Sequence, residues 1–134
     1  MRRGLVVGAV VLVAAVAAVA VFAVVRLTGD DGTGAAQLQV VDADGEVDHD
    51  YVIPAGTQDR RRRGETIEIM PARLDVRVGE SIRITNDDDA GAFVGIFYVG
   101  AGEVVSMRFT TPGTLSGACD LTPDGEFTID VAPV

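Results

Sequence analysis

Cys119 is the single cysteine of a chain of 134 residues that also contains a single histidine, His49. A cysteine thiolate can bind a soft metal ion, attack an electrophile or form a disulfide with another chain. One cysteine cannot close a disulfide within its own chain. A trigonal copper site needs two imidazoles beside the thiolate and a weak axial ligand beyond them. The sequence offers one imidazole far upstream, and therefore does not supply this donor set.

The histidine lies in the acidic stretch Asp48-His49-Asp50, which predicts a solvated loop. A minor alternative is that His49 and Cys119, helped by carboxylates, hold copper(I) or zinc loosely. Three adjacent carboxylates, Asp87-Asp88-Asp89, follow Asn86. Calcium takes about six to eight oxygens from spaced ligands, so we expect these residues to form a turn held by side-chain hydrogen bonds.

The sequence shows no signature of an enzyme. It contains no glycine-rich phosphate loop before a helix, no Ser–His–Asp set except through His49, and no catalytic carboxylate pair that spacing would identify. Cys119 has no basic neighbour in sequence that would activate it as a nucleophile. A redox-sensing thiol that pairs two chains stays open as a further alternative, and it requires an exposed sulfur.

A long apolar segment begins the chain, because residues 4–25 carry no charged side chain. About twenty apolar residues in a helix span the hydrocarbon of a bilayer. We therefore predict a transmembrane anchor over residues 1–27. The alternative is a cleaved signal peptide with its cleavage site in a small-residue run such as Ala14–Ala18.

The charges that flank the apolar segment predict its orientation. Arg2 and Arg3 precede it, and Asp30 and Asp31 follow it. Basic flanks stay cytoplasmic, so we expect a single-pass protein of the cell membrane with its C-terminal part outside the cytoplasm. Residues 28–36, rich in glycine and small polar residues, predict a flexible linker before a domain over residues 37–134.

Charge excludes one class of partner and suggests another. The net charge is −9, and every Asp and Glu lies beyond Arg26, which argues against binding to nucleic acid. Four successive arginines, Arg60, Arg61, Arg62 and Arg63, interrupt this acidic background between Asp59 and Glu65. We expect a solvated loop here, with docking of an acidic partner or of lipid head groups as the alternative.

Apolar residues of the outer domain recur mostly with a period of two, as in Leu74–Val78, Ser81–Ile84 and Phe127–Val131. Turn signals rich in glycine and proline separate these runs, a spacing typical of an antiparallel β-sandwich. The continuous apolar run Ala92–Val99 predicts a strand covered on both faces, or one that bends at Gly95. No segment after Arg26 shows a sustained helical period.

Several motifs over roughly the last half of the chain follow a recognisable order: a segment Pro71–Glu80, a strand ending at Asn86, a polar loop before Phe93, a segment Phe109–Thr114, Cys119, and a strand Gly125–Ile129. The stretch from Ile67 to Val131 resembles a cupredoxin, the blue-copper fold. This resemblance implies an all-β, cupredoxin-like Greek-key β-sandwich.

The resemblance also implies where copper ligands would stand. Cys119 occupies the thiolate position, while the two histidine positions fall at or near Ala92 and at Thr122. Neither alanine nor threonine has a basic nitrogen to replace imidazole. No methionine follows Cys119, and Met70 and Met107 fall on predicted strands, where packing is the simpler role. We therefore expect no metal at these vestigial positions.

The sequence predicts a membrane-anchored, extracytoplasmic cupredoxin-like module without a working copper site. It is expected to be an interaction or structural domain rather than an enzyme, and to need no cofactor. The expected partners are the membrane and a larger membrane protein complex. The alternative is a copper-binding electron-transfer protein resembling cupredoxins or the copper-bearing subunit of terminal oxidases.

Overall fold

The computed structural model describes residues 34–134. The predicted anchor over residues 1–27 and the linker up to residue 33 lie outside the described residues. Between residues 34 and 134, no helix is long and apolar enough to cross a membrane. Packing begins at the start of this part, because Ala36 is already buried.

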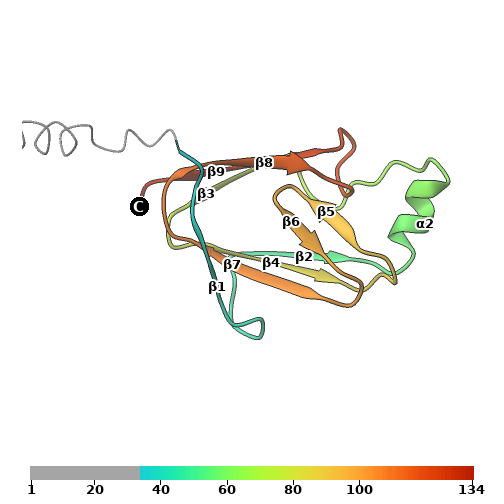
Figure 1. Cartoon of the computed structure of the whole chain (residues 1–134), viewed down its shortest axis with the longest axis horizontal. Coiled ribbons are helices and arrows are strands. Elements are labelled where there is room, and N and C mark those ends of the chain that lie inside the picture. Colours follow the sequence, from blue (N-terminus) through green and yellow to red (C-terminus); the bar gives the residue numbers. More distant parts are fainter. Residues whose placement is uncertain (1–33) are drawn as a thin grey trace, which may run out of the picture. The chain divides into compact units, whose positions relative to one another are not determined.

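Two sheets face each other across one core (Figure 1). Four strands form the first sheet, in the spatial order β1 (Leu38–Val40), β7 (Val104–Phe109), β4 (Ser81–Asn86) and β2 (His49–Ile53). Three strands form the second sheet, in the order β3 (Arg73–Arg77), β9 (Glu126–Ala132) and β8 (Gly113–Ala118). The all-β sandwich predicted from the sequence is confirmed.

Two of the strand pairs are parallel, which the sequence-based expectation of a wholly antiparallel sandwich did not include. β2 pairs in parallel with β4, and β3 pairs in parallel with β9. Parallel neighbours require a long crossover between them. The chain makes one by leaving the first sheet after β2, adding β3 to the second sheet and then returning as β4.

Alternation along the strands places one side chain in two in the core, as in β3, where Leu74 and Val76 are buried between exposed neighbours. The centre of the sandwich combines isoleucines of β4 with aromatic residues of β7 and β9. Its largest fully buried members include Ile82, Ile84, Phe109, Phe127 and Ile129. Each such side chain contributes about 1.5–3 kcal/mol through burial, so the core needs no disulfide.

The apolar run from Ala92 to Val99 bends at Gly95, as one of the two sequence-based alternatives predicted. β5 (Ala92–Val94) and β6 (Phe97–Val99) form a two-stranded antiparallel hairpin. Gly95 has a φ of 61°, a left-handed conformation that glycine adopts without strain. β5 contacts β8 and β6 contacts β4 and β7, so the hairpin closes one end of the sandwich.

One helix, α2 (Thr57–Arg62), was not predicted. It lies at the end of the sandwich away from the labelled C-terminus (Figure 1). Its six residues are Thr-Gln-Asp-Arg-Arg-Arg. A helix this short and without an apolar stripe leaves no helical period to detect. The expected loop at Arg60–Arg63 is corrected accordingly, since three of these arginines are helical and Arg63 is the C-terminal cap.

The close approach of the hairpin to β8 gives a test of the packing at this end. A Cβ atom at Gly117 would lie 2.5 Å from the carbonyl oxygen of Gly95. We expect Gly117→Ala to lower the free energy of unfolding by about 1–3 kcal/mol, because backbone would have to move. Urea unfolding measures this loss. Gly45→Ala is the control, since its Cβ would meet only Asp42 O at 3.5 Å; equal losses in both variants would contradict the packing described.

Candidate functional site

Cys119 lies directly after β8, and 3% of its surface is exposed. It forms an isolated antiparallel bridge with Val94 of the hairpin. The backbone N–H of Gly95 donates to Ala118 O at 2.8 Å, and that of Asp120 donates to Phe93 O at 2.8 Å. Backbone hydrogen bonds therefore join the hairpin to the chain on both sides of the cysteine. A thiol buried in this way is not presented to a second chain, which counts against the interchain disulfide considered above.

The two expected histidine positions lie at the same end of the sandwich as Cys119. Ala92 is fully buried and stands two residues before Val94, on the same face of β5. Thr122 is 6% exposed, and its hydroxyl donates to the carbonyl oxygen of Glu126 at 2.8 Å. At the positions where the resemblance places imidazoles, the chain thus has a methyl group and a hydroxyl that is already hydrogen-bonded.

The solvated loop expected around His49 is corrected, because His49 begins the strand β2 and its side chain is only 22% exposed. It lies at the end of β2 away from Asn86. In the parallel pairing of β2 with β4, His49 stands opposite Ile82, and Ile53 stands opposite Asn86. The loop from Asn86 leads into the hairpin that contacts Cys119. Four residues of extended chain separate the two ends of β2, which corresponds to about 13 Å. His49 instead approaches Glu80, with 3.8 Å between Nε2 and the carboxylate.

The residues beside Cys119 do not fit a type-1 copper ion. The thiol has no imidazole partner, because His49 is at the far end of β2. Within residues 34–134, no three or more His, Cys, Asp or Glu side chains are grouped to hold a metal ion. The minor alternative of a His49–Cys119 metal pair is contradicted by the same geometry.

A carboxylate next to the cysteine organises this end of the domain. Asp120 Oδ2 accepts the backbone N–H of Phe93 at 3.0 Å and the side-chain amide of Gln58 at 3.3 Å. Its other oxygen, Oδ1, lies 2.9 Å from Arg61 Nη2. Asp120 thereby links the hairpin, the helix α2 and the loop that follows Cys119. Neither Asp120 nor Gln58 stands out in the sequence, because their partners are distant in the chain.

The acidic triplet forms a turn held by its own side chains, as expected. Asn86 is fully buried, and its side-chain nitrogen lies 2.9, 3.1 and 3.0 Å from the carbonyl oxygens of Ala90, Val99 and Gly100, which share its two N–H donors. Its side-chain oxygen accepts the backbone N–H of Asp88 at 3.0 Å. Both functions of the Asn86 amide are used, so the loop between β4 and β5 is fixed in one conformation.

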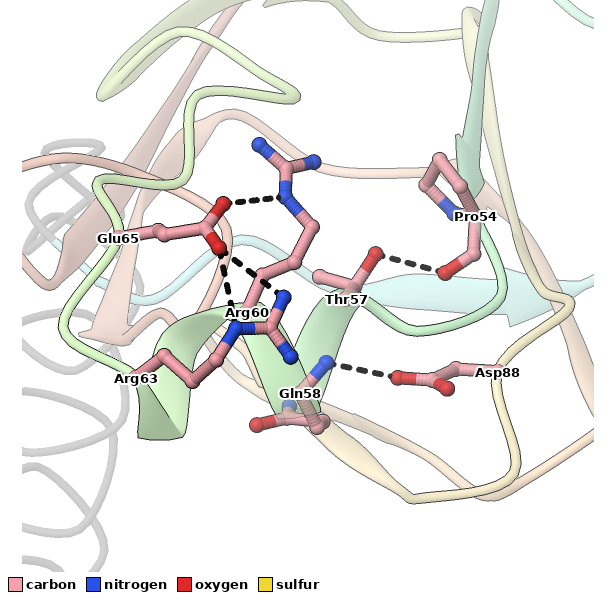
Figure 2. Close-up of polar contacts among 7 residues, drawn as sticks. All are labelled: Pro54, Thr57, Gln58, Arg60, Arg63, Glu65 and Asp88. Atoms are coloured by element: carbon pink, nitrogen blue, oxygen red, sulfur yellow. Dashed lines mark hydrogen bonds and ion pairs between the residues drawn. The ribbon is translucent and has the colours of Figure 1, made fainter.

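Asp88 caps α2 from more than thirty positions away in the sequence. Its two carboxylate oxygens accept the backbone N–H groups of Gly56 at 2.9 Å and of Gln58 at 2.8 Å, and Figure 2 shows the second contact. Gly56, the residue at the N-cap position, makes no side-chain cap of its own. The N–H donors of Gln58 and then Gly56 hold the pKa of Asp88 below its ordinary value of 3.8.

Each of the four arginines has a carboxylate partner within the domain. Arg60 and Arg63 both donate to Glu65 (Figure 2), at 2.8 and 3.0 Å. These two donors, Arg60 first, hold the pKa of Glu65 below its ordinary value. Arg61 pairs with Asp120, and Arg62 pairs with Asp59 at 3.0 Å. The four side chains remain between 49% and 71% exposed.

A cavity of about 330 Å³ separates the segment that follows α2 from the loop that follows Cys119. Cys119 and Thr122 both line it, whereas Ala92 does not. Its walls are the end of α2 and the segment beyond on one side, and the loop 119–125 on the other: Arg61, Glu65, Thr66, Ile67, Cys119, Asp120, Thr122, Pro123, Asp124 and Gly125.

No family model matches the chain, and no curated protein matches it. Among solved structures, it is similar to amicyanin. A Cu(I) form of an amicyanin mutant has 15% identity and a TM-score of 0.46, over 72% of this chain and 99% of that one. Amicyanin from Paracoccus versutus has 13% identity and a TM-score of 0.43, over 71% and 97%. The strand pairing within residues 34–134 defines the sandwich.

The cap at Asp88 predicts a pH-dependent contribution to stability. A carboxyl whose folded pKa is lowered stabilises the fold above its unfolded pKa, here taken as the ordinary value of 3.8, and loses this effect as the pH falls through the folded pKa. We expect Asp88→Asn to lower the free energy of unfolding at pH 7 by about 1–2 kcal/mol. The difference from the unmodified protein should shrink as the pH falls below 3.8. Urea unfolding at a series of pH values measures both effects.

Asp87→Asn is the matched control for this prediction. Asp87 is the adjacent carboxylate and is exposed. A loss at pH 7 that is equal in both variants, or one that persists unchanged in acid, would show that Asp88 is not the charged cap of α2.

Proposed function

We propose that this chain is a membrane-anchored, extracytoplasmic cupredoxin-like module that does not use copper and acts as an interaction or structural domain. The observation that carries the proposal is the state of the two positions where the resemblance places imidazoles: Ala92 is fully buried, and the hydroxyl of Thr122 is bonded to Glu126 O. A buried thiol without nitrogen donors is a poor site for a type-1 ion. The proposal includes the absence of catalytic activity.

The membrane part of the proposal rests on the sequence. Residues 4–25 are uncharged, with arginines before them and aspartates after them. This pattern supports an anchor with its N-terminus in the cytoplasm. The described domain would then be held beside the outer surface of the membrane, where a larger membrane complex is the expected partner.

The cupredoxin-like part of the proposal is supported by topology. The sandwich has parallel pairs β2–β4 and β3–β9 on opposite sheets. Cys119 follows the strand β8, and a hairpin from the loop after Asn86 reaches it. This is the order in which the resemblance places the thiolate and the first histidine position.

Copper binding is the direct test. We expect the full-length chain, purified in detergent micelles, treated with copper(II) and desalted, to retain far less than one copper ion per chain. No intense thiolate-to-copper absorption should appear, because no imidazole accompanies the thiol. Metal analysis and visible absorption spectroscopy measure the two quantities.

Cys119→Ser is the control for copper held elsewhere on an acidic surface. Equal background copper in this variant and in the unmodified chain agrees with the proposal. Stoichiometric copper with intense absorption, both lost in Cys119→Ser, would instead establish the copper-binding electron-transfer alternative.

The four arginines Arg60–Arg63 are the proposed contact with an acidic partner. The pairs of Arg60, Arg62 and Arg63 lie at the surface, where an ion pair contributes about 0–1 kcal/mol. Carboxylates of a partner protein can therefore replace these pairs at little cost. Arg62 is the most available of the four, since its side chain is 71% exposed.

An interaction role predicts a larger assembly that depends on these arginines. We expect the full-length chain, extracted in mild detergent, to migrate with a larger complex on native gels. Replacing Arg62 and Arg63 together by Ala should reduce the co-migrating fraction several-fold, because two exposed guanidinium groups are lost. Arg73→Ala is the control, as Arg73 is also paired and exposed but lies on β3. Loss with Arg73→Ala alone, or with neither variant, would argue against docking through α2.

A further inference from the structure

The helix α2 contributes no apolar side chain to the core, since its residues are Thr, Gln, Asp and three Arg. It is held by hydrogen bonds and an ion pair. Thr57 Oγ1 donates to Pro54 O at 2.6 Å (Figure 2), and Gln58 Nε2 donates to Gly91 O at 3.3 Å. Such bonds contribute a net ~0.5–1.5 kcal/mol each. The helix therefore lacks the apolar burial that stabilises the strands.

A glycine in the left-handed conformation flanks the helix on each side. Gly56 has a φ of 82° and Gly64 a φ of 81°. A Cβ atom at either position would meet nothing within 4 Å, so these glycines serve the backbone turn rather than close packing. A short polar helix between two glycines has few apolar contacts to lose, which is typical of segments that open locally.

This segment and the buried cysteine line the same cavity. Arg61 and Glu65 belong to one wall of the cavity of about 330 Å³, and Cys119 belongs to the facing wall. Arg61 and Gln58 reach across to Asp120, the residue beside the cysteine. The contacts that hold the helix in place therefore also join the two sides of the cavity.

We propose that residues 56–65, which we name the α2 strap, open as a unit while the sandwich stays folded, and that opening exposes the Cys119 thiol. We call the bonds of Gln58 and Arg61 to Asp120 the latch, because they hold the strap in its closed position. The cap at Asp88 holds the N-terminus of the same segment. The inference concerns access to the cysteine and holds whether or not the domain interacts with a partner.

Thiol alkylation in the native state tests the strap, because the chain has a single cysteine. The full-length protein in detergent micelles is treated with N-ethylmaleimide over a range of urea concentrations below the unfolding transition. We expect a labelling rate that depends on urea much more weakly than global unfolding does, since opening the strap exposes little surface. Arg61→Ala and Gln58→Ala should each raise the rate about tenfold.

Arg62→Ala is the matched control, because Arg62 is the next residue of the same helix and pairs only with Asp59 in the described chain. Its labelling rate should stay within about twofold of the unmodified protein. Equal acceleration in Arg61→Ala and Arg62→Ala would overturn the latch. A urea dependence as steep as that of global unfolding would overturn the strap itself.

Hydrogen exchange on the unmodified protein keeps the inference testable if a variant does not fold. The backbone N–H of Arg60 is bonded to Gly56 O at 3.1 Å within the strap. We expect this amide to exchange much faster than the amides of β4 and β9. Protection equal to that of those strands would show that the strap opens only when the whole domain unfolds.

Discussion

The end of the sandwich that carries α2 depends on two buried polar side chains, Asn86 and Asp88. The Asn86 amide satisfies three backbone carbonyls of the loop before β5 and of the end of β6, so the loop has one conformation. That conformation sets Asp88 against the first N–H groups of α2. A buried carboxylate is tolerated only where such donors meet it, and this requirement ties the helix to the loop.

Around Cys119, the same end is filled by packing and by hydrogen bonds. Ala92 and Val94 present small apolar side chains toward the chain around Cys119, and the thiol is almost fully buried. Asp120 turns its carboxylate to Gln58 and Arg61. The polar groups beside the cysteine thus bond to one another. These contacts position the helix at the edge of the cavity.

The strands and turns that could be predicted from the sequence are those that a short-range residue pattern marks. Period-two alternation located strands such as β3, and the apolar run around Gly95 was expected to bend there if it was not covered on both faces. The turn at Asn86–Asp89 was expected from the hydrogen-bonding capacity of its side chains. The helix α2 was missed because its stability comes from Asp88 and Asp120, which lie far away in the sequence. The parallel pairing of β2 with β4 was missed because strand periodicity contains no information about the neighbour.

By itself, the sequence determined which residues are available for chemistry: one thiol, one imidazole and no other candidate for a copper nitrogen ligand. It also determined the alternation that buries one face of each strand. Only the tertiary structure decided that His49 stands at the far end of β2 from the cysteine, and that the arginine run faces Asp120 and Glu65. The physical reason is that side-chain chemistry and strand period are local properties. Distances between groups depend on which strands pair, and long-range burial alone selects that pairing.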